Sequence, residues 1–308
     1  MKIGKYKILN LLGKGTYGYV YKAKAIDNTY YALKKIKLLN NSINENKNII
    51  NEIKVLKYGK CPYILKLQEA LLHSFHICLI TQYANSGDLS QLINKYKYNR
   101  CGLEEDLIWN YFIQISLGVK YLHDNNIIHR DLKTQNIFIH KTAGYNIIKI
   151  GDFGVVKIIQ PEHNSNTIIG TPNFMSPELY KQEVYCKKTD IWSLGCVLYE
   201  IVTRSRPYLE NSANQILVRL RRGDLDPPRK RFPQVSRELE AIVSRAMAFQ
   251  AEDRYLTVDG LRDDVLHYLE GGWVEAARYS AIERLTKWIR RHRVGVGIGA
   301  AVVLSAAT

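Results

Sequence analysis

Five short motifs follow one another along this chain in a fixed order, and they restrict its fold more than any other feature. They are a glycine-rich stretch at residues 13–20, a lysine after an apolar run at Lys34, H-R-D-L-K-x-x-N at residues 129–136, D-F-G at residues 152–154 and S-P-E at residues 176–178. Each motif alone is common by chance, but all five in this order and spacing are not a coincidence. Backbone amides, a cation and hard oxygen donors in one set indicate a phosphate ligand.

The glycine-rich stretch lies between two predicted strands. Glycine lets the backbone approach phosphate oxygens closely and lets its N–H groups donate to them. The strand on either side, and the valine at its end, distinguish it from the dinucleotide-binding fingerprint, which needs a strand and then a helix. Taken alone, a glycine-rich hairpin with no ligand remains the alternative. The spaced positions are Gly13, Gly15, Gly18 and Val20.

Hydrophobic periodicity predicts a strand-rich first part and a mostly helical remainder. Strands are expected at residues 5–12, 20–25 and 30–37, and a helix at residues 44–58. Beyond Asp88 the expected helices are residues 107–125, 190–203, 213–221, 236–248 and 258–269. We expect an α+β architecture with lobes at residues 1–84 and 85–270. A ligand would bind in the cleft between them.

The motif set matches the protein-kinase signature, and the chain resembles the eukaryotic-type protein kinase family over about residues 6–269. The stretches IIHRDLKTQNIFI, IKIGDFG and GTPNFMSPE most resemble the NIMA-related kinases. The part after Arg204 is more similar to bacterial membrane-anchored Ser/Thr kinases. The resemblance implies a bilobal fold, with a small antiparallel β-rich N-lobe carrying helix C and a larger α-helical C-lobe. It also implies a protein serine/threonine kinase that uses ATP and Mg²⁺ and acts on protein Ser/Thr hydroxyls.

The resemblance also implies the catalytic roles. Asp131 would accept or orient the proton of the substrate hydroxyl, and Lys133 would stabilise charge on the transferring phosphoryl group. Asn136 and Asp152 would hold Mg²⁺. Such a set suits phosphoryl transfer, which depends on positioning and on positive charge near the phosphate oxygens.

The remaining ATP contacts follow from the same resemblance. Lys34 would bind the α- and β-phosphates and be oriented by Glu52 on the predicted helix. Thr81 would be the gatekeeper beside adenine. Core packing alone is the other explanation for the apolar members. The expected adenine contacts are the backbones of Gln82 and Ala84 and the side chains of Val20, Ala32 and Phe138.

Two further groups of residues are singled out by the resemblance. Arg130 beside the catalytic aspartate suggests control by activation-loop phosphorylation, with Thr167 as the acceptor; a plain loop threonine is the alternative. Glu178 is expected to pair with a buried Arg254, and Asp190 to hold the backbone of the catalytic loop.

The basic residues change type sharply near residues 202–207. There are 24 Lys and 2 Arg through Thr203, but 16 Arg and 2 Lys from Arg204 onward, and asparagine falls from 19 to 2. One hypothesis is that the chain joins two sources, since A+T-rich coding gives Lys and Asn and G+C-rich coding gives Arg. The other is a natural domain with a biased C-terminal half.

The net charge of +15 fits a solvated basic surface better than a nucleic-acid site, because no nucleic-acid-binding motif accompanies it. Residues 1–10 contain no long apolar run, so no signal peptide is expected. The five cysteines form no C-x-x-C pair, which favours a reducing compartment and a cytoplasmic location. They are Cys61, Cys78, Cys101, Cys186 and Cys196.

The tail changes character after the predicted kinase domain. Residues 271–293 are expected to form a basic amphipathic helix, and residues 294–308 carry no charge. The uncharged run is shorter than the roughly 20 residues that span a bilayer. It is either a truncated transmembrane helix, with the kinase facing the cytosol, or a floppy apolar tail.

Three functions compete at this point: an active Ser/Thr kinase, a catalytically inert kinase-like scaffold (a pseudokinase or non-functional chimera), and a nucleic-acid binder based on the basic excess. Lys34, Asp131, Asn136 and Asp152 are all present, which favours the active kinase. Strong salt-sensitive binding to DNA would favour the third function.

Overall fold

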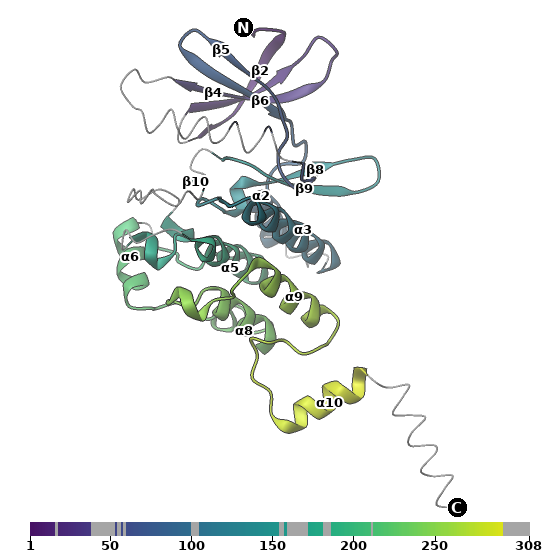
Figure 1. Cartoon of the computed structure of the whole chain (residues 1–308), viewed down its shortest axis with the longest axis vertical. Helices are drawn as coiled ribbons and strands as arrows, with labels where there is room; N and C mark the ends of the chain where they lie inside the picture. Colours follow the sequence, from purple (N-terminus) through teal and green to yellow (C-terminus); the bar gives the residue numbers. More distant parts are fainter. Residues whose placement is uncertain are drawn as a thin grey trace, which may run out of the picture.

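The chain folds into a strand-rich lobe and a larger helical lobe (Figure 1). The two lobes confirm the predicted α+β, bilobal protein-kinase fold. The predicted helix at residues 44–58 lies outside the described residues, apart from residues 53 and 57. The computed structural model describes residues 1–15, 18–37, 53, 57, 60–99, 105–153, 157–158, 172–180, 186–210 and 212–291.

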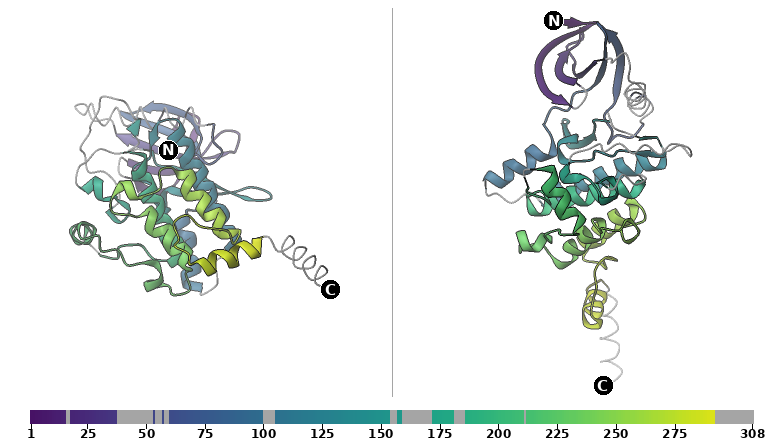
Figure 2. Two further views of the ribbon diagram at one scale, coloured as in Figure 1. Left: turned by 60° about the horizontal axis from the view of Figure 1, so that its bottom comes forward. Right: turned by 90° about the vertical axis from the view of Figure 1, so that its left-hand side faces the viewer.

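The first lobe is a curled antiparallel sheet (Figure 2) with the strand order β1-β2-β3-β4-β6-β5. Alternate residues of these strands face an inner cluster that includes Tyr6, Leu33 and Ile80, so the period-2 pattern has its expected cause. The strands are β1 (Lys2–Ile3), β2 (Tyr6–Gly15), β3 (Gly18–Lys24), β4 (Tyr30–Lys37), β5 (Leu67–His73) and β6 (His76–Gln82).

The second lobe contains the five predicted helices, two with the predicted bounds and three with ends that differ by one to three residues, and one further long helix, α2 (Leu89–Asn99), that was not predicted. Ser212, Ser236 and Thr257 cap three of them, each accepting a hydrogen bond from a backbone N–H of the first turn. The longer helices are α2 (Leu89–Asn99), α3 (Glu105–Asp124), α5 (Lys187–Thr203), α6 (Ala213–Arg221), α8 (Arg237–Ala246) and α9 (Val258–Leu269). The short elements are α4 (Pro177–Tyr180), α7 (Pro228–Arg231), β7 (Ile127–Ile128), β8 (Ile137–Lys141), β9 (Asn146–Ile150) and β10 (Lys157–Ile158).

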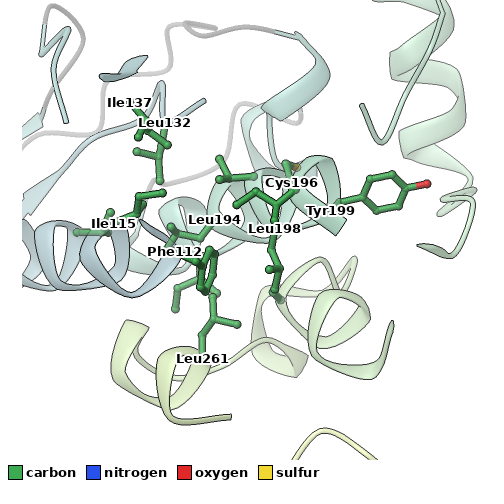
Figure 3. Close-up of a cluster of buried hydrophobic side chains, with 14 of the residues drawn as sticks. Phe112, Ile115, Leu132, Ile137, Leu194, Cys196, Leu198, Tyr199 and Leu261 are labelled. Carbon is green, nitrogen blue, oxygen red and sulfur yellow. The ribbon is translucent and has the colours of Figure 1, made fainter. Parts of the chain in front are cut away.

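Helix α5 forms the centre of the helical lobe, because almost every side chain along it is buried. Leu194 and Leu198 of α5 pack in one cluster with Phe112 of α3 and Leu261 of α9 (Figure 3). Burying one such side chain contributes roughly 1.5–3 kcal/mol. This core fixes α5 beneath the loop that carries the H-R-D motif.

The predicted helix over residues 271–293 is wrong at its beginning, because α10 spans only Ala281–Arg291. The buried Asp264 carboxylate accepts the backbone N–H groups of Glu275 and Ala276, which holds that stretch against α9 in a non-helical form. Ser280 then starts α10 by a reciprocal cap with Glu283. Among the described residues, no helix has the length and apolar character to cross a membrane. Residues 294–308 lie outside the described part.

Candidate active site

A cavity of about 580 Å³ lies between the two lobes. The N-lobe contributes its roof from β2, β3, β4 and β6, and the C-lobe contributes its floor from η1 (Thr134–Asn136), β8 and the D-F-G stretch. The structure thus brings together most of the residues that the motifs single out. Those that line it are Gly13, Val20, Ala32, Lys34, Thr81, Gln82, Ala84, Lys133, Asn136, Phe138 and Asp152.

The apolar half of the cavity suits a flat ring. Ala32 on β4 pairs with Thr81 on β6, so these two small side chains come from neighbouring strands. Phe138 enters from the opposite side on β8. The N–H of Gln82 donates to the carbonyl of Lys66 over 2.9 Å, which fixes the strand end where the lobes connect. The arrangement is compatible with the predicted adenine contacts, whose roles remain predictions.

Glycine occupies the positions of the first motif for different structural reasons. Gly13 lines the cavity, and a Cβ atom placed on it would meet nothing within 4 Å, so it leaves open space beside the ligand cavity. Gly18 has φ of 158°, and a Cβ there would lie 2.0 Å from the carbonyl oxygen of Lys35. Gly15 pairs with Gly18 across the hairpin, and Gly18 is not among the residues that line the cavity. Gly18 is therefore required by the close approach of β4.

The catalytic-loop side chains form a hydrogen-bonded cluster. The Lys133 ammonium contacts the Asp131 carboxylate over 2.7 Å. The Asn136 amide nitrogen donates to the main-chain oxygen of Asp131 over 2.8 Å and to its carboxylate over 3.2 Å. Asp131 is only 8% exposed, so these partners hold its carboxylate in a fixed orientation near the cavity.

Asp190 at the start of α5 supports this loop from beneath. Its fully buried carboxylate accepts the backbone N–H of His129 over 2.9 Å and that of Arg130 over 3.0 Å, and it contacts His123 over 2.8 Å. Burial alone would raise the pKa of Asp190, but the hydrogen bond and charge of His123 outweigh burial, so this pKa is lowered. Arg130 has φ of 67°, an uncommon backbone conformation for a non-glycine residue that Asp190 holds directly.

Lys34 and Asp152 meet across the cavity. The ammonium of Lys34 lies 2.8 Å from the Asp152 carboxylate, so strand β4 and the D-F-G stretch are joined by one ion pair. Burial alone would raise the pKa of Asp152, but Lys34 and Lys133 outweigh burial, so this pKa is lowered. Asp152 is therefore ionised near neutral pH. Glu52, the predicted partner of Lys34, lies outside the described residues.

Asn136 and Asp152 present donors that fit Mg²⁺, a cation that takes oxygen ligands and usually shares them with phosphates. Because the Asn136 amide nitrogen donates to Asp131, the amide oxygen is the atom suited to a cation. A carboxylate and an amide oxygen that both line this cavity are ligands of the chemical kind that Mg²⁺ takes. The metal-ligand roles themselves remain predictions.

Glu178 and Arg254 form the predicted buried pair. The guanidinium donates to both carboxylate oxygens, over 2.9 Å and 2.8 Å, and Thr189 adds a hydroxyl donor to Glu178 over 3.0 Å. Burial alone would raise the pKa of Glu178, but Arg254 outweighs burial, so this pKa is lowered. Thr167, the predicted regulatory residue, lies outside the described residues.

Several cavity residues were not predicted from the sequence. Leu65 is one wall, and it packs so closely on Gly151 that a Cβ there would lie 2.3 Å from the leucine Cδ1 and 3.0 Å from Phe138. Gly151 directly precedes the D-F-G motif. This position next to a motif was the sequence signal that could have identified Gly151 as part of the cavity wall. The unpredicted lining residues are Leu12, Lys14, Leu65, Leu79, Tyr83 and Gln135.

Comparison with known proteins agrees with this geometry. Residues 6–266 match the family model of the protein kinase domain. Serine/threonine-protein kinase Nek5 of Homo sapiens is 34% identical over 252 residues, which cover 81% of this chain and 35% of the relative. Serine/threonine-protein kinase Nek4 of Mus musculus is 32% identical over 276 residues, or 89% of this chain and 34% of the relative.

Serine/threonine-protein kinase Nek8 of Danio rerio is 35% identical over 238 residues, covering 76% of this chain and 33% of the relative. The chain therefore spans about a third of the length of these curated relatives. The predicted resemblance to the NIMA-related kinases is confirmed. The family match continues past Arg204, and the resemblance of that later part to bacterial kinases stays a prediction.

Proposed function

Because the chain belongs to the protein kinase domain family, we propose that it is a serine/threonine-protein kinase that transfers the γ-phosphoryl group of ATP to Ser/Thr hydroxyls of proteins. The observation that carries the proposal is the convergence of two cations, two carboxylates and one amide at the inter-lobe cavity: four of these groups line it, and the fifth, Asp131, is hydrogen-bonded to two of the four. These groups are Lys34, Asp131, Lys133, Asn136 and Asp152.

Each group has a distinct task in this proposal. Asp131, oriented by Lys133 and Asn136, accepts a hydrogen bond from the substrate hydroxyl and takes its proton as the oxygen attacks the γ-phosphorus. Lys133, 2.7 Å from that carboxylate, lies where negative charge develops on the transferring group. Lys34 binds the phosphates that remain as the leaving group.

Mg²⁺, when bound, would neutralise charge on the phosphate oxygens and orient them. Asn136 and Asp152 would hold it through their side-chain oxygens. The lowered pKa of Asp152 keeps this ligand ionised at neutral pH. The chain's own contribution is therefore to fix positions and charges in advance, and the apolar half of the cavity, with Ala32 and Phe138, would hold the base of the nucleotide.

The test is an Asp131→Asn variant assayed with radiolabelled ATP and a generic protein substrate. We expect the rate to fall by about a thousandfold or more, a barrier change of roughly 4 kcal/mol. Asp124→Asn, at an exposed aspartate ending α3, is the matched control and should keep the wild-type rate. Near-normal autophosphorylation by Asp131→Asn would refute the assignment.

Thermal melting of the wild type with and without Mg-ATP separates the kinase from an inert scaffold. A raised melting temperature together with phosphoryl transfer supports the kinase. A raised melting temperature without transfer would support a kinase-like scaffold that binds nucleotide and does no chemistry.

We also propose that phosphorylation of Thr167 activates the enzyme. A phosphate in that segment could pair with the guanidinium of Arg130, whose backbone is held by Asp190 next to the catalytic aspartate. Mass spectrometry after incubation with ATP tests this idea. An active enzyme with no phosphate on Thr167 would remove it.

For the location, we propose the cytoplasm, where ATP is available and thiols stay reduced. The cysteines among the described residues carry free thiols, which suits that compartment. Anchoring through a membrane-spanning segment at residues 294–308 remains a proposal from the sequence. Fractionation of cells that express the chain would test the location, and recovery in an oxidising compartment would contradict it.

A further inference from the structure

Helix α10 stands away from the body of the protein, at the end opposite the β-rich lobe (Figures 1 and 2). Its sequence, AIERLTKWIRR, has four basic residues and one acidic residue among eleven positions. The cap formed by Ser280 and Glu283 fixes its beginning locally, so the helix does not depend on packing for its start.

The positions along α10 separate cleanly into two faces. At about 100° per residue, the apolar positions fall within an arc of about 120°, and the basic positions fall outside it. The apolar positions are 281, 282, 285, 288 and 289, and the basic positions are 284, 287, 290 and 291.

Lys287 shows how these faces are oriented relative to the body. Its ammonium donates to the carbonyl of Gly272 over 2.9 Å, contacts Glu238 over 3.2 Å and lies 5.0 Å from the centre of the Tyr279 ring. Position 287 is about 160° round the helix from the centre of the apolar arc. The side of α10 that carries position 287 is therefore tethered to the body, and the arc of apolar positions lies on the opposite side of the helix axis.

The exposure of Ile282 agrees with this orientation of the helix, since 78% of the surface of this apolar side chain is exposed. A helix of a globular domain normally turns its apolar stripe toward the core. Here Ile282 is turned outward instead, and Arg284, whose position lies at the edge of the apolar arc, is exposed as well.

We propose that α10 is an interfacial helix that docks this protein on an anionic lipid surface. The apolar face would enter the boundary between headgroups and acyl chains, and Arg284, at the edge of that face, would meet the lipid phosphates. The excess of cations over anions in α10, and the net charge of +15 of the chain, give the complementarity to an anionic surface.

The test is co-sedimentation of the full 308-residue chain with vesicles of phosphatidylcholine alone and of phosphatidylcholine with about 30% phosphatidylserine. We expect binding to the anionic vesicles, weakened about fivefold by Arg284→Gln, since one basic residue near such a surface contributes about that factor. Ile282→Asp should weaken binding at least tenfold, because it places a charge on the face that enters the lipid.

Leu256→Asp is the matched control, because Leu256 is also 78% exposed and the charge change is the same. It should leave vesicle binding unchanged, and thermal melting should show that each variant is folded. The proposal is overturned if the wild type does not bind anionic vesicles. A helix that binds an acidic protein rather than a lipid surface would give that result. The proposal is also overturned if Ile282→Asp binds as well as Leu256→Asp, which would assign the binding to another segment. Neither readout depends on phosphoryl transfer.

Discussion

The lysine-rich residues 1–203 and the arginine-rich residues 204–308 use their cations differently. Among the contacts within the described residues, the Lys133 ammonium lies 2.7 Å from one Asp131 carboxylate oxygen, and the Lys34 ammonium lies 2.8 Å from one Asp152 carboxylate oxygen. Arg254 instead makes five hydrogen bonds, two to the Glu178 carboxylate and three to main-chain carbonyls. Arg219 contacts three acidic side chains in its neighbourhood. An ammonium is a point charge, whereas a guanidinium is a fork that joins several segments.

This difference does not divide the fold. The Glu178–Arg254 pair crosses the composition change, and so does the contact of Lys120 with Asp259. The matched family region, residues 6–266, continues through it as well. Residue choice near the break therefore changes the kind of cation contact while the architecture stays the same. Whether the chain joins two sources remains a hypothesis, which uniform base composition of its coding sequence would contradict.

The largest effect should come from breaking the pair that bridges the two regions. Arg254→Ala leaves the Glu178 carboxylate buried without its cation, so we expect the free energy of unfolding to fall by roughly 3–5 kcal/mol. Urea denaturation measures it. Arg262→Ala is the control, since Arg262 pairs with Asp259 and Asp263 on the surface of α9 and should cost below about 1 kcal/mol. If Arg254→Ala and Arg262→Ala lowered the free energy of unfolding equally, the buried Glu178–Arg254 pair would contribute no more than a surface pair.

The pH dependence should sharpen the same comparison. The pKa of Glu178 is lowered in the folded protein, so its stabilising contribution is present above the unfolded pKa of about 4.3 and is lost as the pH falls through the folded pKa. Each unit of lowering corresponds to about 1.4 kcal/mol. The difference in unfolding free energy between wild type and Glu178→Gln should therefore narrow as the pH drops below about 5. A difference that stays constant down to pH 2 would contradict this origin.

The smallest effect should come from exchanging the two cations at the surface. Arg219→Lys removes the fork that reaches Glu210 and Asp224, and we expect a loss of about 1 kcal/mol, reduced by solvent screening. Lys120→Arg makes the reverse exchange at an exposed site and should leave the urea midpoint unchanged. If Arg219→Lys and Lys120→Arg shifted the urea midpoint by the same amount, the shape of the cationic group would not explain the difference between the two regions.

The sequence predicted the parts that depend on local pattern. The residues of H-R-D-L-K-x-x-N lie within one loop, so their spacing alone indicates that Asp131, Lys133 and Asn136 meet. Five of the longer helices of the second lobe were also predicted, because their apolar positions follow a helical period; they are α3, α5, α6, α8 and α9, whereas α2 was not predicted. The lobes and the fold class followed from the same signals.

The unpredicted parts depend on contacts between distant residues or on unusual turns. The wall made by Leu65 against Gly151 joins segments that share no motif. The hairpin between β5 and β6 turns at Ser74 and Phe75, both with positive φ and neither a glycine, so the usual turn signal is missing. The beginning of α10 was misplaced because the clamp by Asp264 acts from another helix.

The packing of α5 has one more consequence. Its buried side chains come from before residue 204, yet they interleave with Leu261 and other side chains that come after it (Figure 3). The molecule therefore has no internal seam at the point where its amino-acid usage changes. A protease cut between residues 203 and 204 would leave two fragments that each lack part of a shared interior, so we expect neither fragment to fold alone.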